Sequence, residues 1–508
     1  MRGNLVMYDV RGIQSYIFRT NTMKEIIGAS QLVDGKIMEL FKAVVDKEEH
    51  PLTFDFDWKN NKNDFIQTQN DIEVIYEGGG NIIAYFKDQE IMNSINRKLS
   101  LALFKNMSGL SLAVASVEMT DNYEKDRNKL MKAMDKIKAM NSMISPMGNL
   151  PITMQDPMTG LPLCKNTREL GHQLAPRKIS LESFQKLEKY FYEVSKESKE
   201  NRKKYALEFD DMVKEKGEDS YIAVVHIDGN SMGNRIKNIL ENTVDYGKAV
   251  SKMRNISSSI YKTFDVDGLN AIDDKLDELV NNNILKLNNG RYPYRKIISA
   301  GDDITFVCRA DLALTLVEAY IHKVQQGYMY IETEDKDKDE FKCSCCAGIT
   351  LMHSHFPFSV AYEYAEACCG SAKQVAKANK INNKVGNYVD FQVVYSGLLT
   401  NVEELRKRNY TNGKYTLCKR PYDIDNLNSE CKLEDFKKSL KTVQELPRSW
   451  AKRFRDAYYE DKSVLLTEIK AAKSRGYSIG EEELYDENNI ATYYDALEMM
   501  DMWGDEYE

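Results

Sequence analysis

The stretch KIISAGDDITFV, residues 296–307, decides the fold that we expect for this chain. Two runs of β-forming residues, 296–299 and 304–307, flank an alanine, a glycine and two adjacent aspartates, and this pattern predicts a tight hairpin. Two neighbouring carboxylates at a hairpin tip repel each other unless a positive charge lies between them. Gly301-Asp302-Asp303 alone is weak evidence for a metal site, because water and loose counterions are sufficient on an ordinary surface turn, so a metal site needs a further carboxylate.

An apolar run upstream supplies that carboxylate. YIAVVHID, residues 221–228, has the length of a buried strand and ends in Asp228. Aspartates 228, 302 and 303 brought together would hold divalent cations through oxygen ligands, and Mg²⁺ is the expected metal because it also accepts water and substrate phosphates. Two such ions can activate a hydroxyl and stabilise a leaving pyrophosphate. The stretch therefore predicts the metal-binding centre of a nucleotidyl-transfer site.

Composition narrows the class of protein. With 508 residues, of which 42% are hydrophobic, the chain has room for about three domains with sizeable cores. No run of 18 apolar residues and no signal peptide is evident, so we expect a soluble, cytoplasmic protein without a membrane segment. The net charge of −8 argues against a sequence-independent grip on duplex nucleic acid. The nine cysteines are expected to be reduced core residues, and no zinc site is expected.

The order of strands and helices occurs twice. In the first copy the pattern predicts a strand at 3–10, helix from 13 to about 45 with a break near 28–30, a hairpin at 72–86, a helix at 89–106 and a strand at 110–118. The second copy begins at the strand that carries Asp228, continues through the 296–307 hairpin, and ends with a strand at 342–351 and a helix at 359–379. Each copy therefore reads βαββαβ, which indicates an internal duplication.

The two copies differ where chemistry would occur. The hairpin of the first copy reads Gly78-Gly79-Gly80-Asn81 and lacks carboxylates, although Asp9 remains at the end of its first strand. We expect this copy to hold metal poorly, while its glycines leave room for a phosphate or a base near the backbone. One active and one inactive copy suggest a donor site and an acceptor site.

Five motifs, in this order, support a family resemblance: YDVRGIQSYIF (8–18), EIIGAS (25–30), GGGN (78–81), DGNSMG (228–233) and GDD (301–303). Together they resemble the palm-domain large subunit of type III CRISPR effector complexes, the "CRISPR polymerase" family. The resemblance implies an α+β fold with two ferredoxin-like (βαββαβ) palm or cyclase-like domains, a connector and a C-terminal helical bundle. We expect the first palm at 1–141, the connector at 142–220, the catalytic palm at 221–390 and the helical domain at 391–508.

The resemblance also implies an activity, a Mg²⁺-dependent nucleotidyltransferase or cyclase that converts ATP into a cyclic oligonucleotide messenger for antiviral defence, with Mn²⁺ as an expected substitute. By position, Asp228, Asp302 and Asp303 correspond to the catalytic, metal-binding carboxylates. Lys373, with Lys377 one turn further on, is the candidate for the triphosphate, although a solvated helix face explains Lys373 equally well. The remaining candidates for nucleotide binding are Gly301, Ser30, Gly79 and Gly80.

The sequence departs from the family's pattern at three points. The family often carries an N-terminal HD nuclease domain, but no His-Asp dipeptide occurs here, so DNA cleavage by that route is not expected. A cysteine-rich zinc module often separates the palms, whereas the connector keeps only Cys164. The hairpin has Ala300 before Gly301 where the family usually has two glycines, which could restrict the backbone of the turn.

Two alternatives stay open. The same site could produce a cyclic dinucleotide or a cyclic mononucleotide, because small changes in acceptor placement alter the product. The chain could instead be a nucleotide-binding scaffold subunit of an RNA-guided effector complex, with small helical subunits and guide or target RNA as partners. Base specificity, ring size, the activating trigger and the oligomeric state cannot be read from the sequence.

Overall fold

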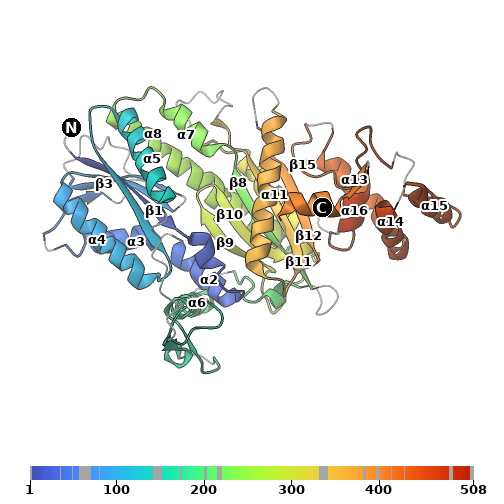
Figure 1. Ribbon diagram of the computed structural model, residues 1–508, viewed down its shortest axis with the longest axis horizontal. Coiled ribbons are helices and arrows are strands. Elements are labelled where there is room, and N and C mark those ends of the chain that lie inside the picture. Colours follow the sequence, from blue (N-terminus) through green and yellow to red (C-terminus); the bar gives the residue numbers. More distant parts are fainter. Residues whose placement is uncertain are drawn as a thin grey trace.

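The computed structural model describes sixteen stretches of the chain, and three parts follow one another along its long axis (Figure 1). They are an N-terminal α/β part, a central α/β part and a C-terminal helical part. The described residues are 3–34, 36–48, 50–55, 70–78, 80–140, 152–171, 174–199, 203–213, 220–330, 341–380, 385–395, 401–413, 415–427, 430–460, 462–479 and 484–503.

The N-terminal part is built on a five-stranded sheet with the order β2-β3-β4-β1-β5. Its strands are β1 (Asn4–Arg11), β2 (Phe54–Asp55), β3 (Ile72–Gly78), β4 (Asn81–Phe86) and β5 (Ser111–Glu118). Without the short β2, the strands lie in the order second, third, first, fourth, which is the ferredoxin-like arrangement expected from the βαββαβ pattern. Along β1, Val6 and Tyr8 join one hydrophobic core and Leu5 and Met7 the other, so the sheet is covered on both faces.

The helical stretch after β1 differs from the prediction. It forms three helices, α1 (Ile13–Ile17), α2 (Met23–Val33) and α3 (Lys36–Val45), and α2 continues through Gly28 without a break. Gly28 instead allows a close contact with α6 (Leu181–Lys199), because a Cβ atom there would lie 1.8 Å from the carbonyl oxygen of Lys186. The glycine that we interpreted as a helix break is therefore a packing position.

The central part contains a six-stranded sheet with the order β15-β12-β11-β8-β10-β9. Its strands are β8 (Tyr221–Gly229), β9 (Tyr294–Ala300), β10 (Asp303–Arg309), β11 (Cys345–His353), β12 (Tyr388–Val394) and β15 (Tyr422–Asp423). The four strands β9, β10, β8 and β11 repeat the ferredoxin-like order, which confirms the α+β class. β12 pairs parallel to β11 and β15 pairs with β12, so the sheet continues past residue 390, where we expected this unit to end. The domain boundaries stay predictions.

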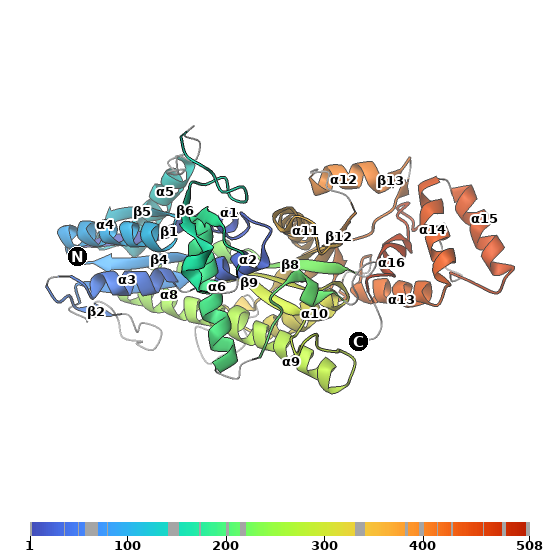
Figure 2. The same cartoon turned by 90° about the horizontal axis from the view of Figure 1, so that it is seen from below.

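Helices cover the central sheet and join it to its neighbours. They are α7 (Met232–Leu240), α8 (Tyr246–Ile260), α9 (Leu269–Asn281), α10 (Ala313–Val324) and α11 (Phe358–Ala378), and a π-helical segment, Tyr261–Gly268, links α8 to α9. α8 runs alongside the first sheet (Figure 2) and is tied to β3 by two hydrogen bonds to backbone carbonyls. Arg254 donates to Val74 O at 2.9 Å, and Ser257 donates to Glu77 O at 2.5 Å. The two α/β parts therefore share a polar seam.

The remaining elements belong to all parts of the chain. The N-terminal part also contains α4 (Gln89–Asn106) and α5 (Tyr123–Ala139). The connector contains β6 (Leu163–Asn166), a short helix at Thr167–Leu170, β7 (Lys178–Ser180), α6 and a short helix at Phe209–Met212. The C-terminal part contains α12 (Val402–Asn409), β13 (Thr411–Asn412), β14 (Tyr415–Thr416), α13 (Leu433–Gln444), α14 (Arg448–Glu460), α15 (Lys462–Lys473) and α16 (Tyr494–Met499). Packing of α14 against α15 and of α13 against α16 confirms the helical character expected there.

The structure tests two expectations from composition, one on membrane-spanning helices and one on the cysteines. Within the described ranges, no helix is both long enough and apolar enough to cross a bilayer. All nine cysteines are free thiols, and six of them are buried, but Cys164 is exposed and Cys418 and Cys431 are half-buried. The prediction that every cysteine is a core residue is therefore wrong for these three.

Candidate functional site

The three candidate carboxylates lie together at the end of two adjacent strands. β8 and β10 pair antiparallel with Asp228 directly opposite Asp303, and β9 pairs with β10 so that Ala300 faces Asp303. The turn between them consists of Gly301 and Asp302, and the φ angle of Gly301 is 74°, a conformation that favours glycine in tight hairpin turns. Asp302 lies over Gly229, where an added Cβ would approach its Oδ2 to 2.6 Å.

The electrostatics of this cluster reflect an excess of negative charge. Burial, with repulsion from Asp228, raises the pKa of Asp303 to about 8 and that of Asp302 to about 6. His226 lies next to Asp303, with Nδ1 at 3.3 Å from Oδ1, but burial lowers the pKa of this histidine to about 4, so it brings no charge at neutral pH. The cation at the site is Lys373 of α11, which donates to Asp228 and, at 2.9 Å, to the carbonyl oxygen of Gly229.

The donor chemistry of the cluster fits a divalent cation. Oδ1 of Asp303 is buried and accepts no hydrogen bond from any residue that the structure describes, and the pKa of its carboxyl is raised by burial and by Asp228. A hard cation would remove both penalties, since carboxylate oxygens are its usual ligands. As the side chains stand, however, no group of three or more His, Cys, Asp or Glu residues among the described ones converges closely enough to hold a metal ion. Lys373 holds the carboxylate of Asp228 where a cation would compete for it.

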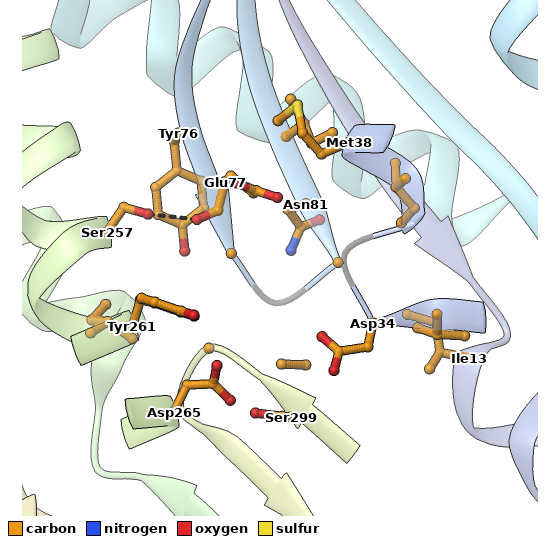
Figure 3. Close-up of a pocket in the computed structure, with 18 of the residues that line it drawn as sticks. Ile13, Asp34, Met38, Tyr76, Glu77, Asn81, Ser257, Tyr261, Asp265 and Ser299 are labelled. Atoms are coloured by element: carbon orange, nitrogen blue, oxygen red, sulfur yellow. Dashed lines mark hydrogen bonds between the residues drawn. The ribbon is translucent and has the colours of Figure 1, made fainter. Parts of the chain in front are cut away.

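A cleft of about 420 Å³ opens beside the carboxylates (Figure 3). It lies between the β3–β4 turn of the first sheet and the β9–β10 hairpin of the second, and Ala300 and Gly301 form part of its wall. Its polar lining is mainly acidic and hydroxylated, with one amine. These residues are Asp34, Glu77, Asp265, Tyr76, Ser257, Tyr261, Ser299, Asn81 and Lys296.

The close-up shows how these groups are arranged. Asp265, Tyr261 and Ser299 lie on the side of the second unit, whereas Asp34 and Asn81 face them from the first (Figure 3). Burial, with a contribution from Asp302, raises the pKa of Tyr76 to about 12, so its hydroxyl keeps its proton at neutral pH. The cleft therefore offers many hydrogen-bond acceptors and few cations.

The other residues expected at the site are dispersed. Gly80, at a φ of 76°, lines the cleft together with Gly301, whereas Gly79 lies outside the described residues. Ser30 is 5% exposed within α2 and is not part of the cleft lining. Lys377 is exposed on α11, one turn from Lys373.

Sequence reasoning missed most of the cleft's polar lining. Tyr261 and Asp265 stand four residues apart, a spacing that would place them on one face of a helix, but the same spacing occurs on any amphipathic helix. Asp34 follows α2 directly, and nothing in its neighbourhood distinguishes it from a surface aspartate. Their convergence depends on how the two sheets pack, which no local pattern encodes.

Comparisons with known proteins agree with this arrangement. Residues 221–383 match the family model described as Cas10/Cmr2, second palm domain, which confirms the resemblance drawn from the motifs. No curated protein matches the chain in sequence. A solved structure of a Csm1-Csm4 cassette in complex with one ATP superposes with a TM-score of 0.51 at 12% identity, covering 99% of this chain and 70% of that one.

Two further solved structures are similar at lower scores. The Csm1-Csm4 cassette in complex with pppApApA gives a TM-score of 0.49 at 11% identity, covering 98% of this chain and 69% of that chain. Csm1 in T. onnurineus gives 0.47 at 16% identity, covering 99% and 69%. At these identities the likeness concerns the fold.

Proposed function

We propose that this chain is a nucleotidyltransferase that converts ATP into a cyclic oligonucleotide, at the carboxylates 228, 302 and 303 and the adjoining cleft. The observation that carries the proposal is the direct pairing of Asp228 with Asp303 across β8 and β10, beside a cleft to which the same hairpin contributes Gly301. The match of residues 221–383 to the second palm domain of Cas10/Cmr2 supports it. So does the fold shared with a Csm1-Csm4 cassette whose structure contains one ATP.

In the proposed reaction the 3′-oxygen of one nucleotide bonds to the α-phosphorus of another. The bond from that phosphorus to the bridging oxygen breaks, pyrophosphate leaves with the electron pair, and the hydroxyl proton is released to water. Asp228, Asp302 and Asp303 would hold Mg²⁺, or Mn²⁺ as a substitute, and bound cations of this kind activate the attacking hydroxyl and neutralise the charge of the leaving group.

The residues of the chain itself would mainly position the reactants. The cleft, rich in acceptors, would hold the nucleoside, whose ribose hydroxyls and exocyclic amine are donors, and would fix its orientation relative to the hairpin. Lys373 is the cation nearest to the carboxylates and is our candidate for contact with the phosphates once it is released from Asp228. A histidine or cysteine nucleophile is not needed for this reaction.

Product analysis tests the proposal. Purified protein is incubated with Mg²⁺ and each nucleoside triphosphate in turn, and the products are identified by mass spectrometry. We expect cyclic oligoadenylate from ATP with the wild type and with Asp274→Ala, an exposed control on α9, and no product from the double variant Asp302→Ala/Asp303→Ala. A cyclic dinucleotide or mononucleotide that also depends on these aspartates would retain the site and correct the product.

The scaffold alternative predicts a different result. No product from any nucleoside triphosphate with Mg²⁺ or Mn²⁺, also after copurified RNA and partner subunits are added, would refute the enzymatic proposal. The solved neighbours named above include Csm1-Csm4 cassettes, and we propose that this chain likewise acts with small effector subunits or RNA in type III CRISPR defence. Copurification of such partners with the tagged chain from its native cell would support this part of the proposal.

A further inference from the structure

A second and larger cavity, of about 960 Å³, opens where β8 ends and β11 and β12 begin. Ser231, three residues after Asp228, and Ser344, just before β11, form part of its wall, whereas no residue of the β9–β10 hairpin does. The loop that follows Asp228 therefore borders this cavity, and the cavity is separate from the acidic cleft between the two sheets.

Arg235 of α7 brings a half-buried positive charge to this cavity. It is half-buried and donates from Nη1 to the carbonyl oxygen of Lys342 at 2.5 Å and from Nη2 to Ser344 Oγ at 3.1 Å. Both partners are neutral, and no described carboxylate forms an ion pair with this guanidinium. Burial lowers the pKa of Arg235. A partly buried guanidinium without a carboxylate is unusual, since buried charges are normally paired.

The two carboxylates in the wall are already engaged elsewhere. Asp423 accepts backbone hydrogen bonds from Asp425 and Leu427, each at 2.9 Å. Asp425 accepts from the backbone and side-chain amides of Asn387, at 3.0 to 3.1 Å. These contacts direct the acidic oxygens into their own loop, so they do not neutralise Arg235.

Further positive charge surrounds the opening. Lys342 and Lys380 line the cavity with exposed side chains and form no ion pair with a described acid. Lys373 and Lys377 lie one turn apart near the end of α11, and Lys380 follows two residues after that helix ends at Ala378. α7 also begins at this cavity, and its N-cap Ser231 makes no side-chain capping bond, which leaves donors of the first turn available.

We propose that this cavity is a binding site for a phosphoanhydride anion, held by Arg235, Lys342 and Lys380. Planar guanidinium groups and ammonium groups are the usual protein partners of such anions. Inorganic pyrophosphate is the occupant that we favour, and this choice rests on the proposed function, because pyrophosphate would leave a carboxylate cluster that includes Asp228, and Ser231, three residues further on, is part of the wall of this cavity. The triphosphate end of a nucleotide has the same chemistry and is the other source to distinguish.

The test is a titration of the full chain with sodium pyrophosphate in EDTA, followed by calorimetry, so that no divalent cation can bridge the ligand to the aspartates. We expect Arg235→Gln to weaken binding by at least about tenfold, and Lys380→Gln, which removes an exposed charge, by about threefold. Lys237→Gln, exposed on α7 but not part of the cavity wall, is the matched control and should bind as the wild type does. Parallel titrations with ATP and with AMP distinguish free pyrophosphate from the triphosphate end of a nucleotide as the ligand.

The outcomes separate this site from the catalytic proposal. Binding that survives in Asp302→Asn/Asp303→Asn but weakens in Arg235→Gln and Lys380→Gln supports the cavity site, whether or not the chain makes a cyclic product. Stronger binding of ATP than of pyrophosphate, with the same variant pattern, would assign the site to a nucleotide's triphosphate. Binding unaffected by both cavity variants, or binding of single-stranded RNA but of no phosphoanhydride, would overturn the inference. Lys380→Gln changes an exposed side chain and should fold normally. The test therefore stays decisive even if Arg235→Gln fails to fold.

Discussion

Replacing Asp303 with asparagine should make the metal-free protein less sensitive to rising pH. The folded-state pKa of Asp303, about 8, lies above the ordinary value of 3.8 for an aspartate. A carboxyl with a raised pKa favours the folded state while it is protonated, so its contribution is lost as the pH rises from its unfolded value toward about 8. Between about pH 5.5 and about pH 8 this amounts to 2.5 pH units at about 1.36 kcal/mol each, or roughly 3 kcal/mol. Because the side chain keeps 32% of its surface exposed, solvent screening reduces the expected loss to about 1.5–2 kcal/mol.

Urea unfolding at both pH values, in EDTA, measures this loss. The wild type and the exposed control Asp274→Asn should lose about 1.5–2 kcal/mol of unfolding free energy over that interval, and Asp303→Asn should lose less than half as much. The remainder comes from Asp302, whose pKa is raised to about 6. Excess Mg²⁺ should restore the wild type at the higher pH if the aspartates bind it. An equal loss in Asp303→Asn and in the wild type would refute the reasoning, because the buried carboxyl would then not titrate in this range.

Three further predictions concern α11 and the ion pairs. Gly348→Ala should lower the unfolding free energy by about 2 kcal/mol or more, because the new Cβ would lie 2.0 Å from the carbonyl oxygen of Ala365 on α11. The control Gly370→Ala, whose Cβ would meet no atom within 4 Å, should be neutral or stabilising by up to about 1 kcal/mol. Equal midpoints of urea unfolding for the two variants would contradict this prediction. Lys373→Met should reduce the rate of product formation, measured by mass spectrometry, at least about tenfold, because Lys373 donates a hydrogen bond to Asp228. Lys377→Met, one turn away, should reduce that rate less than about threefold. Equal rates for the two variants would show that Lys373 is not part of the site. Arg406→Met should lower the stability of the protein in thermal unfolding by about 3–5 kcal/mol, because it leaves the fully buried carboxylate of Asp390 without its charged partner. Arg406 donates two hydrogen bonds, of 2.7 and 2.9 Å, to this carboxylate. A loss below about 1 kcal/mol would show that Asp390 finds other partners.

The sequence was sufficient to find the hairpin that carries Asp302 and Asp303 and its partner strand. Gly301-Asp302-Asp303 carries both the turn signal and the carboxylates, and the apolar run before Asp228 fixes a buried strand, so the pairing of Asp228 with Asp303 follows once the two strands are neighbours. The repeated βαββαβ order predicted the ferredoxin-like strand order of both sheets, because that topology allows few other arrangements.

Long-range packing explains the parts that could not be predicted. We interpreted Gly28 as a helix break because glycine lowers helix propensity. A glycine that allows another helix to pack closely gives the same signal in the sequence. Only the contact with Lys186, more than 150 positions away, distinguishes the two cases. The strand β12 was not predicted from the sequence for a similar reason, because its parallel partner β11 is joined to it through the whole of α11.

The charges around the hairpin suggest how a nucleotide would be oriented. Among the described residues, three carboxylates and one amine line the cleft, and that amine, of Lys296, lies 3.4 Å from Asp34, so these groups leave an excess of negative charge. A triphosphate placed there would meet like charges at short range in a partly buried site, where repulsion is only weakly screened. The nucleoside, a donor of hydrogen bonds without charge, meets no such penalty. The phosphates would therefore point out of the cleft, past the carboxylates toward Lys373. Lys380, which follows two residues after the end of the same helix, lines the cavity of Arg235.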